Sequence, residues 1–365
     1  MAGVYISYPF CAQKCTYCNF ASGVFPRELE PRYVQALVRE ISGHEWAWTP
    51  ETVYLGGGTP SGMRTDDLAR ILAAVPHRAN WREATIEAAP GGITSDHAAA
   101  WVRAGINRVS LGVQSFVQRE LARTGRKHSA ETVEREIAAL RAAGLSNINI
   151  DLIAGLPGQN RASWAESLAW IARLEAPHVS VYMLEIDDDS RLGHEVLLNG
   201  KRYGAPDVPS DDLTAELYES AVRALAQMGI ERYEISNFAR PGFESLHNLK
   251  YWRLAPYVGF GSDAHSFDAA IRSQNIESAR EYVEQIESGQ SAHIQGTRPD
   301  ASEEAFFVGL RLSEGIEPQA DDWSKFEQPI SRFIAEGLLE RNGSRLRLTD
   351  RGVLLSNEVF AEFIS

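Results

Sequence analysis

The sequence predicts an α/β fold built as an incomplete parallel (β/α)6 barrel, followed by a smaller C-terminal helical domain. Short β-branched runs alternate with amphipathic segments along residues 1–240, a pattern typical of parallel barrels and sheets. Glycines end several of the amphipathic segments, and polar residues follow several of the apolar runs. Six such units leave a barrel open along one side. The expected strands are Val4–Tyr8, Thr52–Leu55, Ala84–Ala88, Arg108–Val113, Asn147–Ile153 and Val179–Ile186.

The helices between these strands are indicated by their apolar spacing. Pro31 suits an early helical position, and Tyr33, Leu37 and Ile41 follow it at helical intervals. Gly105 and Gly144 are expected to end later helices. The later helices are expected at Asp66–Val75, Ser95–Ala104, Ser129–Ala143 and Arg161–Leu174.

The remaining chain is expected to form two further parts. We assign residues 1–240 to the barrel, 241–297 to a connecting region and 298–365 to the C-terminal domain. Leu346–Thr349 is expected to form a short wing strand beside a helix, as in a winged-helix fold. The helix is indicated by the spacing of Ile330, Phe333, Ile334, Leu338 and Leu339.

Composition excludes two classes of protein. No run approaches the roughly 18 consecutive apolar residues of a membrane-spanning helix. The net charge of −13 argues against a non-specific nucleic-acid binder, which needs basic surface. Free thiols and the lack of a leader-like start favour a cytoplasmic protein.

All three cysteines lie in the run Cys11-Ala-Gln-Lys-Cys15-Thr-Tyr-Cys18. Three thiolates can hold three irons of a 4Fe–4S cluster and leave the fourth iron open to another ligand. Structural zinc prefers four closed ligands, and no nearby histidine completes that set. A disulfide framework is disfavoured because the number of cysteines is odd. The spacing therefore predicts an open iron–sulfur site.

Further unusual residues stand where the expected strands end. Gly56–Gly58 follows the second strand, Glu87 closes the third, Gln114 closes the fourth, and Asp151 lies in the fifth. Ligand sites of barrels gather at the carboxyl ends of strands, so these groups are expected to converge at one mouth. The glycines alone suit an ordinary tight turn, but a carboxylate on an apolar strand is costly without a partner. A cationic or hydroxyl-rich ligand would provide that partner.

These motifs together resemble the radical S-adenosylmethionine (SAM) superfamily, and within it the HemN-like branch, over nearly the whole chain. The resemblance implies that Cys11, Cys15 and Cys18 bind the cluster and that SAM chelates the open iron. Ala89 departs from the usual EANP form of this branch, and the contacts of that asparagine are absent here. The residues implied to contact SAM are Tyr5, Tyr17, Gly57, Gly58, Thr59, Glu87, Gln114, Arg126 and Asp151.

The branch contains coproporphyrinogen dehydrogenases and a sister family of heme chaperones. The dehydrogenases carry a fourth cysteine where this chain has Phe20, and they have a long N-terminal arm, whereas ten residues precede Cys11. The run His247-Asn-Leu-Lys-Tyr-Trp252 matches the HNxxYW motif of the chaperones, within a similar stretch that ends at Gly261-Ser-Asp-Ala-His-Ser266.

The HNxxYW motif has two interpretations. Histidine ligates iron and aromatic rings pack on porphyrin, so His247, Tyr251 and Trp252 are candidate heme-binding residues. His247 is expected to act as a direct ligand or to shape the site. Without the resemblance, a capped turn with a core aromatic pair would be the simpler explanation. His128, His178 and His194 stand singly, and ordinary surface or core roles are expected for them.

The resemblance thus implies a heme chaperone that transfers heme to an acceptor protein and contains a 4Fe–4S cluster and SAM. The alternative is an oxygen-independent coproporphyrinogen III dehydrogenase, which decarboxylates propionate side chains by radical chemistry in porphyrin biosynthesis. The expected partners are heme and a heme-accepting protein, without nucleic acid or a transmembrane segment. The acceptor, its membrane association and the oligomeric state stay open.

Overall fold

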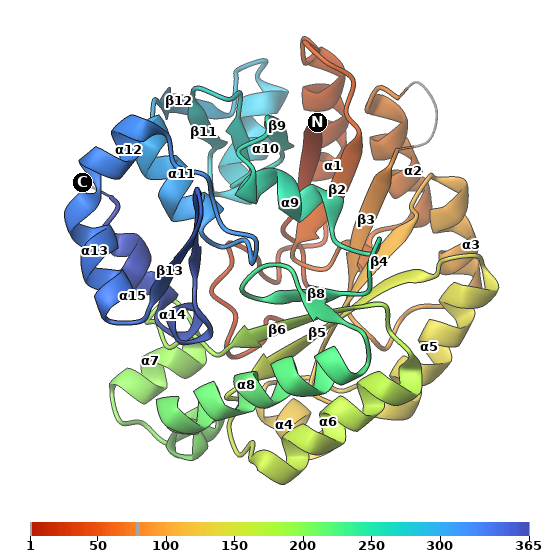
Figure 1. Ribbon diagram of the computed structural model, residues 1–365. Coiled ribbons are helices and arrows are strands. Elements are labelled where there is room, and N and C mark those ends of the chain that lie inside the picture. Colours follow the sequence, from red (N-terminus) through yellow and green to blue (C-terminus); the bar gives the residue numbers. More distant parts are fainter. Residues whose placement is uncertain (1, 78–80, 365) are drawn as a thin grey trace.

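A computed structural model describes residues 2–77 and 81–364 (Figure 1). Its main feature is a twelve-stranded sheet in the order β12-β11-β10-β9-β1-β2-β3-β4-β5-β6-β8-β7. Neighbouring strands from β1 to β6 pair in parallel, which confirms the expected incomplete barrel. These strands are β1 (Gly3–Tyr8), β2 (Thr52–Gly57), β3 (Glu83–Ala88), β4 (Arg108–Gln114), β5 (Asn147–Ala154) and β6 (His178–Met183).

The sixth strand ends earlier than Ile186, where the sequence pattern placed its end. Leu184 donates a last backbone hydrogen bond to the Ala154 carbonyl, at 2.8 Å. Beyond this point, Asp187 accepts a hydrogen bond from Asn19 in the cysteine loop at 2.8 Å. The acidic run that starts at Asp187 is therefore tied to the cysteine loop at its first residue.

Amphipathic helices cover the outside of the barrel. Gly105 and Gly144 follow α3 and α5 closely, and both have φ of +97°, a left-handed conformation that favours glycine. The barrel helices are α1 (Leu29–Gly43), α2 (Thr65–Ala74), α3 (Ser95–Arg103), α4 (Gln118–Arg123), α5 (Ala130–Ala142), α6 (Arg161–Leu174), α7 (Arg191–Leu197) and α8 (Asp211–Gln227), with short 3-10 turns at Pro60–Gly62 and Arg202–Asp207.

The sheet continues beyond both ends of the parallel set. β9 pairs in parallel with β1, whereas β10, β11 and β12 follow it in antiparallel order. At the other end β8 pairs antiparallel with β6. The added elements are β7 (Glu231–Arg232), β8 (Asn237–Ala239), α9 (Leu246–Trp252), β9 (Tyr257–Phe260), β10 (His265–Phe267), β11 (Arg272–Asn275), α10 (Ala279–Glu287) and β12 (His293–Thr297).

The C-terminal segment packs beside the open side of the barrel, on the left in Figure 1. Phe306, Phe326 and Phe363 form its centre, with ring centroids 4.6–5.3 Å apart. The expected wing strand is present as β14, but the helix ends at Ala335, and Leu339, which the sequence pattern placed on the helix, begins β13, the partner strand of the wing. The elements are α11 (Ala301–Gly309), α12 (Ala320–Lys325), α13 (Glu327–Ala335), β13 (Leu339–Asn342), β14 (Arg345–Leu348), α14 (Asp350–Leu354) and α15 (Ser356–Ala361).

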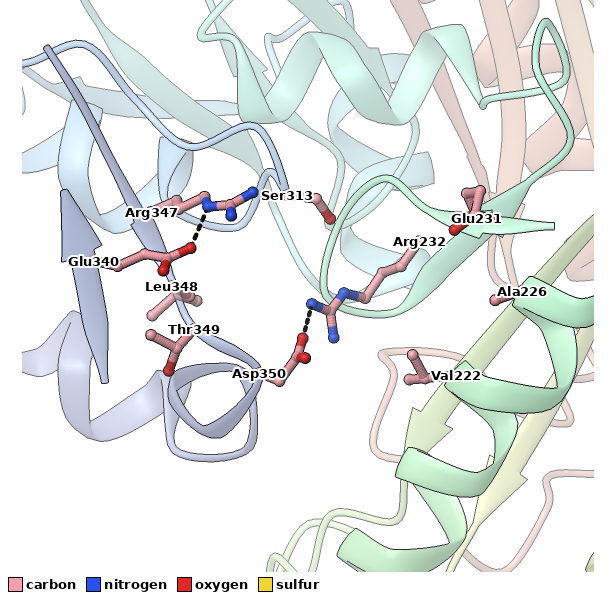
Figure 2. Close-up of a pocket in the computed structure, with 10 residues that line it drawn as sticks. All are labelled: Val222, Ala226, Glu231, Arg232, Ser313, Glu340, Arg347, Leu348, Thr349 and Asp350. Atoms are coloured by element: carbon pink, nitrogen blue, oxygen red, sulfur yellow. Dashed lines mark hydrogen bonds and ion pairs between the residues drawn. The ribbon is translucent and has the colours of Figure 1, made fainter. Parts of the chain in front are cut away.

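A cleft of about 440 Å³ separates this segment from α8 and β7 (Figure 2). Arg232 of β7 and Asp350 of α14 form an ion pair across the cleft, at 2.7 Å. Arg347 and Glu340 pair at 2.5 Å on the wing itself. In the described residues, no helix is long and apolar enough to cross a membrane. The division of the chain at residues 240 and 297 stays a prediction.

Candidate cofactor site at the barrel mouth

The three cysteines lie in the loop that follows β1. None is in a disulfide, and all three are half-buried. The loop folds back on itself, because the Cys11 N–H donates to the Gly23 carbonyl at 2.8 Å and the Gly23 N–H donates to the Pro9 carbonyl at 2.9 Å. The backbone therefore fixes the base of the loop while the thiols keep some access to solvent.

The thiols have hydroxyl neighbours and lie near one another. Thr59 donates to Cys11 Sγ at 3.7 Å, and the Ser22 hydroxyl lies 3.9 Å from Cys18 Sγ. Burial raises the pKa of the Cys11 thiol, and the nearby Cys18 and Cys15 raise it further. In residues 2–77 and 81–364, no group of three His, Cys, Asp or Glu side chains could hold a single metal ion.

The glycine loop packs directly against the cysteine loop. The Gly58 N–H donates to the Tyr8 carbonyl at 2.8 Å, and the Thr59 N–H donates to the Phe10 carbonyl at 2.9 Å. A Cβ on Gly58 would lie 2.7 Å from the Phe10 carbonyl oxygen, so a larger residue would push the loops apart. Gly57 has φ of +105°, which also favours glycine. Close packing thus favours glycine at position 58, and the backbone conformation favours glycine at position 57.

Glu87 lies beside this loop, inside the barrel. Tyr54 of β2 donates its hydroxyl to Glu87 Oε1 at 2.8 Å, and the Tyr54 ring stacks near that of Tyr5, with centroids 6.2 Å apart. Burial raises the pKa of Glu87 to about 7, although the Tyr54 hydroxyl and the Gly57 N–H favour the charged form. A cationic group bound here would complete the stabilisation of the carboxylate.

Gln114 and Arg126 meet on the neighbouring wall. Gln114 ends β4 at a register shift and has φ of +71°, a strained conformation for a residue with a side chain. Its Oε1 is buried and has no hydrogen-bond partner among residues 2–77 and 81–364, and the same holds for Nε of Arg126. Arg126 also donates to the Tyr17 hydroxyl at 3.3 Å and interacts with the Cys15 thiol. Buried polar atoms are rarely left unpaired, so one acceptor and one donor here are available to a ligand.

Asp151 lies one strand further along, on β5. Asn149 donates to Asp151 Oδ1 at 2.7 Å, and Ser110 donates to Oδ2 at 3.4 Å. Burial raises the pKa of the Asp151 carboxyl, and hydrogen bonds from Ser180 and Asn149 counteract that rise. Ordered hydrogen bonds therefore hold this carboxylate inside the barrel.

The residues present fit a 4Fe–4S cluster with SAM. Three thiols that form no disulfide stand beside a glycine loop, and the Gln114 acceptor and Arg126 donor without a partner among the described residues lie near Cys15. SAM carries an ammonium, a carboxylate and ribose hydroxyls, which need these donor and acceptor types. The structure brings together the cysteines, the glycine loop and the SAM-contact residues expected from the sequence, in one region at the barrel mouth.

The HNxxYW motif lies elsewhere, at the amino ends of the strands. His247 is fully buried on α9, with Nδ1 2.8 Å from the Thr52 hydroxyl and Nε2 2.8 Å from the Tyr251 hydroxyl. Both ring nitrogens are therefore occupied. Glu83, the first residue of β3, accepts hydrogen bonds from the backbone N–H groups of Leu246 and His247 at 2.8 and 3.0 Å. The first turn of α9 is thus anchored to the bottom of the barrel.

The other members of the motif have partly buried aromatic roles. The Tyr251 ring packs edge-on against Tyr257, with centroids 4.7 Å apart. The Arg311 guanidinium lies 4.5 Å from the Trp252 ring centroid, which links α9 to the C-terminal segment. Direct ligation of iron by His247 would require the loss of at least one of its two hydrogen bonds.

Sequence reasoning missed the residues that support the carboxylates. Tyr54 binds Glu87, and Asn149 and Ser110 bind Asp151. Strand alternation could have indicated Asn149, because it stands two residues before Asp151 and shares its side of the sheet. Tyr182 was also missed; it lies on this inner side of β6 and keeps 42% of its surface exposed.

Comparison with known proteins agrees with this site. The radical SAM superfamily model matches residues 5–171, and that of the HemN C-terminal domain matches residues 297–355. Heme chaperone HemW of Lactococcus lactis is 33% identical over 99% of this chain and 96% of its own length. Heme chaperone HemW of Escherichia coli is 30% identical over 99% of this chain and 98% of its own length. The solved structure of E. coli coproporphyrinogen III oxidase (HemN) superposes with a TM-score of 0.85 at 21% identity, covering 100% of this chain and 90% of that one, which shows a shared fold.

Proposed function

The chain belongs to the radical SAM superfamily and, within it, to the HemW family; on this premise we propose that it is a heme chaperone that binds heme and transfers it to acceptor proteins. The proposal includes a 4Fe–4S cluster on Cys11, Cys15 and Cys18, with SAM on the open iron. Two observations support it: HemW relatives match along nearly the whole chain, and three disulfide-free thiols lie beside buried polar atoms at the barrel mouth.

Each part of the mouth has a distinct task in this proposal. Glu87 and Asp151 supply acceptors for ammonium or hydroxyl groups, whereas Arg126 supplies a donor for a carboxylate or hydroxyl. Gln114 offers an amide oxygen to a donor on the ligand. Tyr5, Tyr17, Gly57, Gly58 and Thr59 complete the proposed SAM-contact set. When bound, the cluster and SAM supply one-electron chemistry.

The chain's own contacts connect these residues to the proposed cluster ligands. Arg126 interacts with Cys15 and Tyr17, so the guanidinium connects the SAM-contact wall to the cysteine loop. Thr59 performs the same task on the glycine side through its contact with Cys11. A ligand that binds these walls would therefore also stabilise the cysteine loop.

Heme binding is proposed from the family. Phe20 occupies the position two residues after Cys18, and 67% of its surface is exposed, so an apolar ring stands there in place of a thiol. His247, Tyr251 and Trp252 remain heme-binding candidates. Because both ring nitrogens of His247 have hydrogen-bond partners, its geometry favours a role in shaping the heme site over direct ligation of the iron. The proposed cytoplasmic location and an acceptor protein also follow from the family.

The decisive experiment uses anaerobically reconstituted full-length protein with SAM and a reductant. One sample receives coproporphyrinogen III and a parallel sample receives heme. A saturable Soret shift with heme, without protoporphyrinogen IX from the other sample, supports the chaperone. Stoichiometric or better conversion to protoporphyrinogen IX would instead establish the dehydrogenase alternative.

A further inference from the structure

His178 is the first residue of β6 and is fully buried inside the barrel. It pairs with Asn149 of β5, and paired residues point to the same side of a sheet. Asn149 stands two residues before Asp151, so all three side chains face the interior. Nδ1 of His178 lies 2.6 Å from Oδ1 of Asn149, and Nε2 lies 2.9 Å from the hydroxyl of Tyr233, which follows β7. The imidazole therefore lies between the neighbour of Asp151 and a residue outside the parallel strands.

The Asp151 carboxylate determines the direction of these hydrogen bonds. A carboxylate only accepts, so the amide nitrogen of Asn149 must face Asp151 Oδ1, 2.7 Å away. The amide oxygen then faces His178, which must donate from Nδ1. Burial and the nearby Arg108 charge hold the pKa of His178 well below its usual range, so the imidazole is neutral and carries one proton. Nε2 therefore accepts the hydrogen bond from the Tyr233 hydroxyl.

The series of donors begins at α9. The backbone N–H of Ser245, the residue that caps the amino end of α9, donates to the Tyr233 hydroxyl at 3.1 Å. Tyr233 donates to His178, which donates to Asn149. Asn149 completes the series on Asp151. Hydrogen bonds that run in one direction polarise and strengthen one another, so this series links the bottom of the barrel to a carboxylate at its mouth.

We propose that His178 is a positioning residue of the SAM site, which orients the Asp151 carboxylate through Asn149. This inference rests on the SAM binding in the proposed function and names the residue that holds one of its contacts in place. His178 is fully buried, whereas Asp151 keeps part of its surface exposed, so the imidazole acts on a ligand at the mouth through its neighbours.

The proton on Nδ1 is the part of His178 that performs this task. It fixes the Asn149 amide with its oxygen toward His178 and its nitrogen toward Asp151. The Ser180 hydroxyl lies farther from that oxygen, at 3.2 Å, and shares its single proton with Asn237 at 2.7 Å. Without the Nδ1 donor the amide can turn over, because its two ends have nearly the same shape. The amide oxygen would then face the carboxylate, and two acceptors repel each other.

The first test is a calorimetric titration of SAM into cluster-loaded, full-length wild type, His178→Asn and His178→Gln. An asparagine amide nitrogen lies near the place of Nδ1, whereas a glutamine amide nitrogen lies near that of Nε2. His178→Asn therefore keeps a donor toward Asn149 and should bind SAM within about twofold of the wild type. His178→Gln loses that donor and should bind about fivefold or more weakly. A role in packing alone predicts the opposite order, because asparagine fills less of the site than glutamine does.

The second test places His178→Gln in an Asp151→Ala background. The double variant should bind SAM as Asp151→Ala does, because no carboxylate is left to orient. Losses that multiply would show that His178 acts independently of Asp151, and the inference would be wrong.

Tyr233→Phe provides a further measurement in case the His178 variants fold poorly, since it removes one oxygen atom only. The partner of one ring nitrogen determines which of the two carries the proton, so loss of this hydroxyl weakens the preference for a proton on Nδ1. SAM should bind about twofold or more weakly. Tyr218→Phe is the matched control, because Tyr218 is fully buried and its hydroxyl donates to the Ile235 carbonyl, outside the series. It should bind SAM as the wild type does, and equal affinities of the two tyrosine variants would overturn the inference.

The outcomes separate the inference from the proposed function. If the wild type binds no SAM, the proposed SAM site and this inference are both wrong. If the wild type and Asp151→Ala bind SAM equally, SAM binding stands, but Asp151 is no contact and the inference is wrong with it. If Asp151→Ala is weakened and His178→Gln binds no more weakly than His178→Asn, the contact stands and His178 does not position it.

Discussion

The hydroxyl of Thr52, the first residue of β2, lies 2.8 Å from Nδ1 of His247 on α9. This contact joins the bottom of the barrel to the HNxxYW motif, and the Tyr251 hydroxyl occupies the other ring nitrogen at 2.8 Å. Burial lowers the pKa of His247 to about 3, so its imidazole is neutral at physiological pH. A neutral imidazole held on both sides is a structural bridge inside the core.

Replacement of His247 by alanine should therefore lower stability. It leaves the Thr52 and Tyr251 hydroxyls unpaired in the core, a loss of about 1–3 kcal/mol for each unsatisfied group. Urea unfolding of the reconstituted protein measures the change, and His293→Ala is the control at an exposed histidine. Heme titration of the same variant tests the shaping role, for which a weaker or altered Soret shift is expected. Unchanged unfolding would contradict the bridge.

The strands could be predicted because their signal is local. All six expected barrel strands are present, and Gly105 and Gly144 adopt the left-handed conformation expected of helix ends. The cysteine spacing is equally local. The position of His247 could not be predicted in this way, since its partner Thr52 lies 195 residues away and only the tertiary fold brings them together.

Contacts between distant parts of the sequence also determine the sheet beyond the barrel, so its strand order could not be predicted. β9 pairs with β1 although more than 200 positions separate them, so residues 257–260 gave no sign that they extend the parallel set. Sequence spacing alone placed His265 in a chaperone-like stretch without indicating which way it faces.

Replacement of any one cysteine by serine should remove the cluster. Cys11, Cys15 and Cys18 are the only cysteines of the chain, so no other thiol can substitute. Anaerobic reconstitution followed by iron analysis should show loss of nearly all bound iron and of the broad visible absorbance. Ser22→Ala, which keeps all three thiols, is the control and should retain the cluster. Four irons retained in any cysteine variant would refute the ligand assignment.

Asp151→Ala should weaken SAM binding. The carboxylate is held by Asn149 and Ser110, so it is preorganised and its removal loses a buried partner worth about 1–3 kcal/mol. Calorimetric titration of SAM into the cluster-loaded protein measures the loss. Asp188→Ala, in the acidic run outside the barrel, serves as the control. Equal affinities in the two variants would show that Asp151 does not contact SAM.

Removal of the ion pair across the cleft in Figure 2 should have a small effect. The Asp350 side chain is 88% exposed, whereas that of Arg232 is 16% exposed. Exposed pairs contribute less than about 1 kcal/mol, so Asp350→Asn should barely change urea unfolding. Arg232→Ala should cost more, because Arg232 also interacts with the Tyr218 hydroxyl. Equal losses in the two variants would mean that only the ion pair matters.

The last prediction concerns the pH dependence caused by Glu87. Burial raises its pKa to about 7, above the ordinary value of 4.5, so the folded protein holds this proton more tightly than the unfolded chain does. Without ligand, stability should therefore fall as pH rises from 4.5 to about 7 and should level off above that range.

Bound SAM should favour the ionised form of Glu87, because the positive charge of SAM attracts the carboxylate. Below about pH 7 binding must displace a proton from Glu87, so the affinity for SAM should increase as the pH rises through 7. Glu87→Gln cannot ionise, and it should bind SAM more weakly with a flatter pH profile. Calorimetric titrations from about pH 6 to 8 measure the affinity for SAM and its pH dependence, with Asp188→Asn as the control. If Glu87→Gln keeps the wild-type pH profile, another group titrates and Glu87 does not carry the charge that SAM recognises.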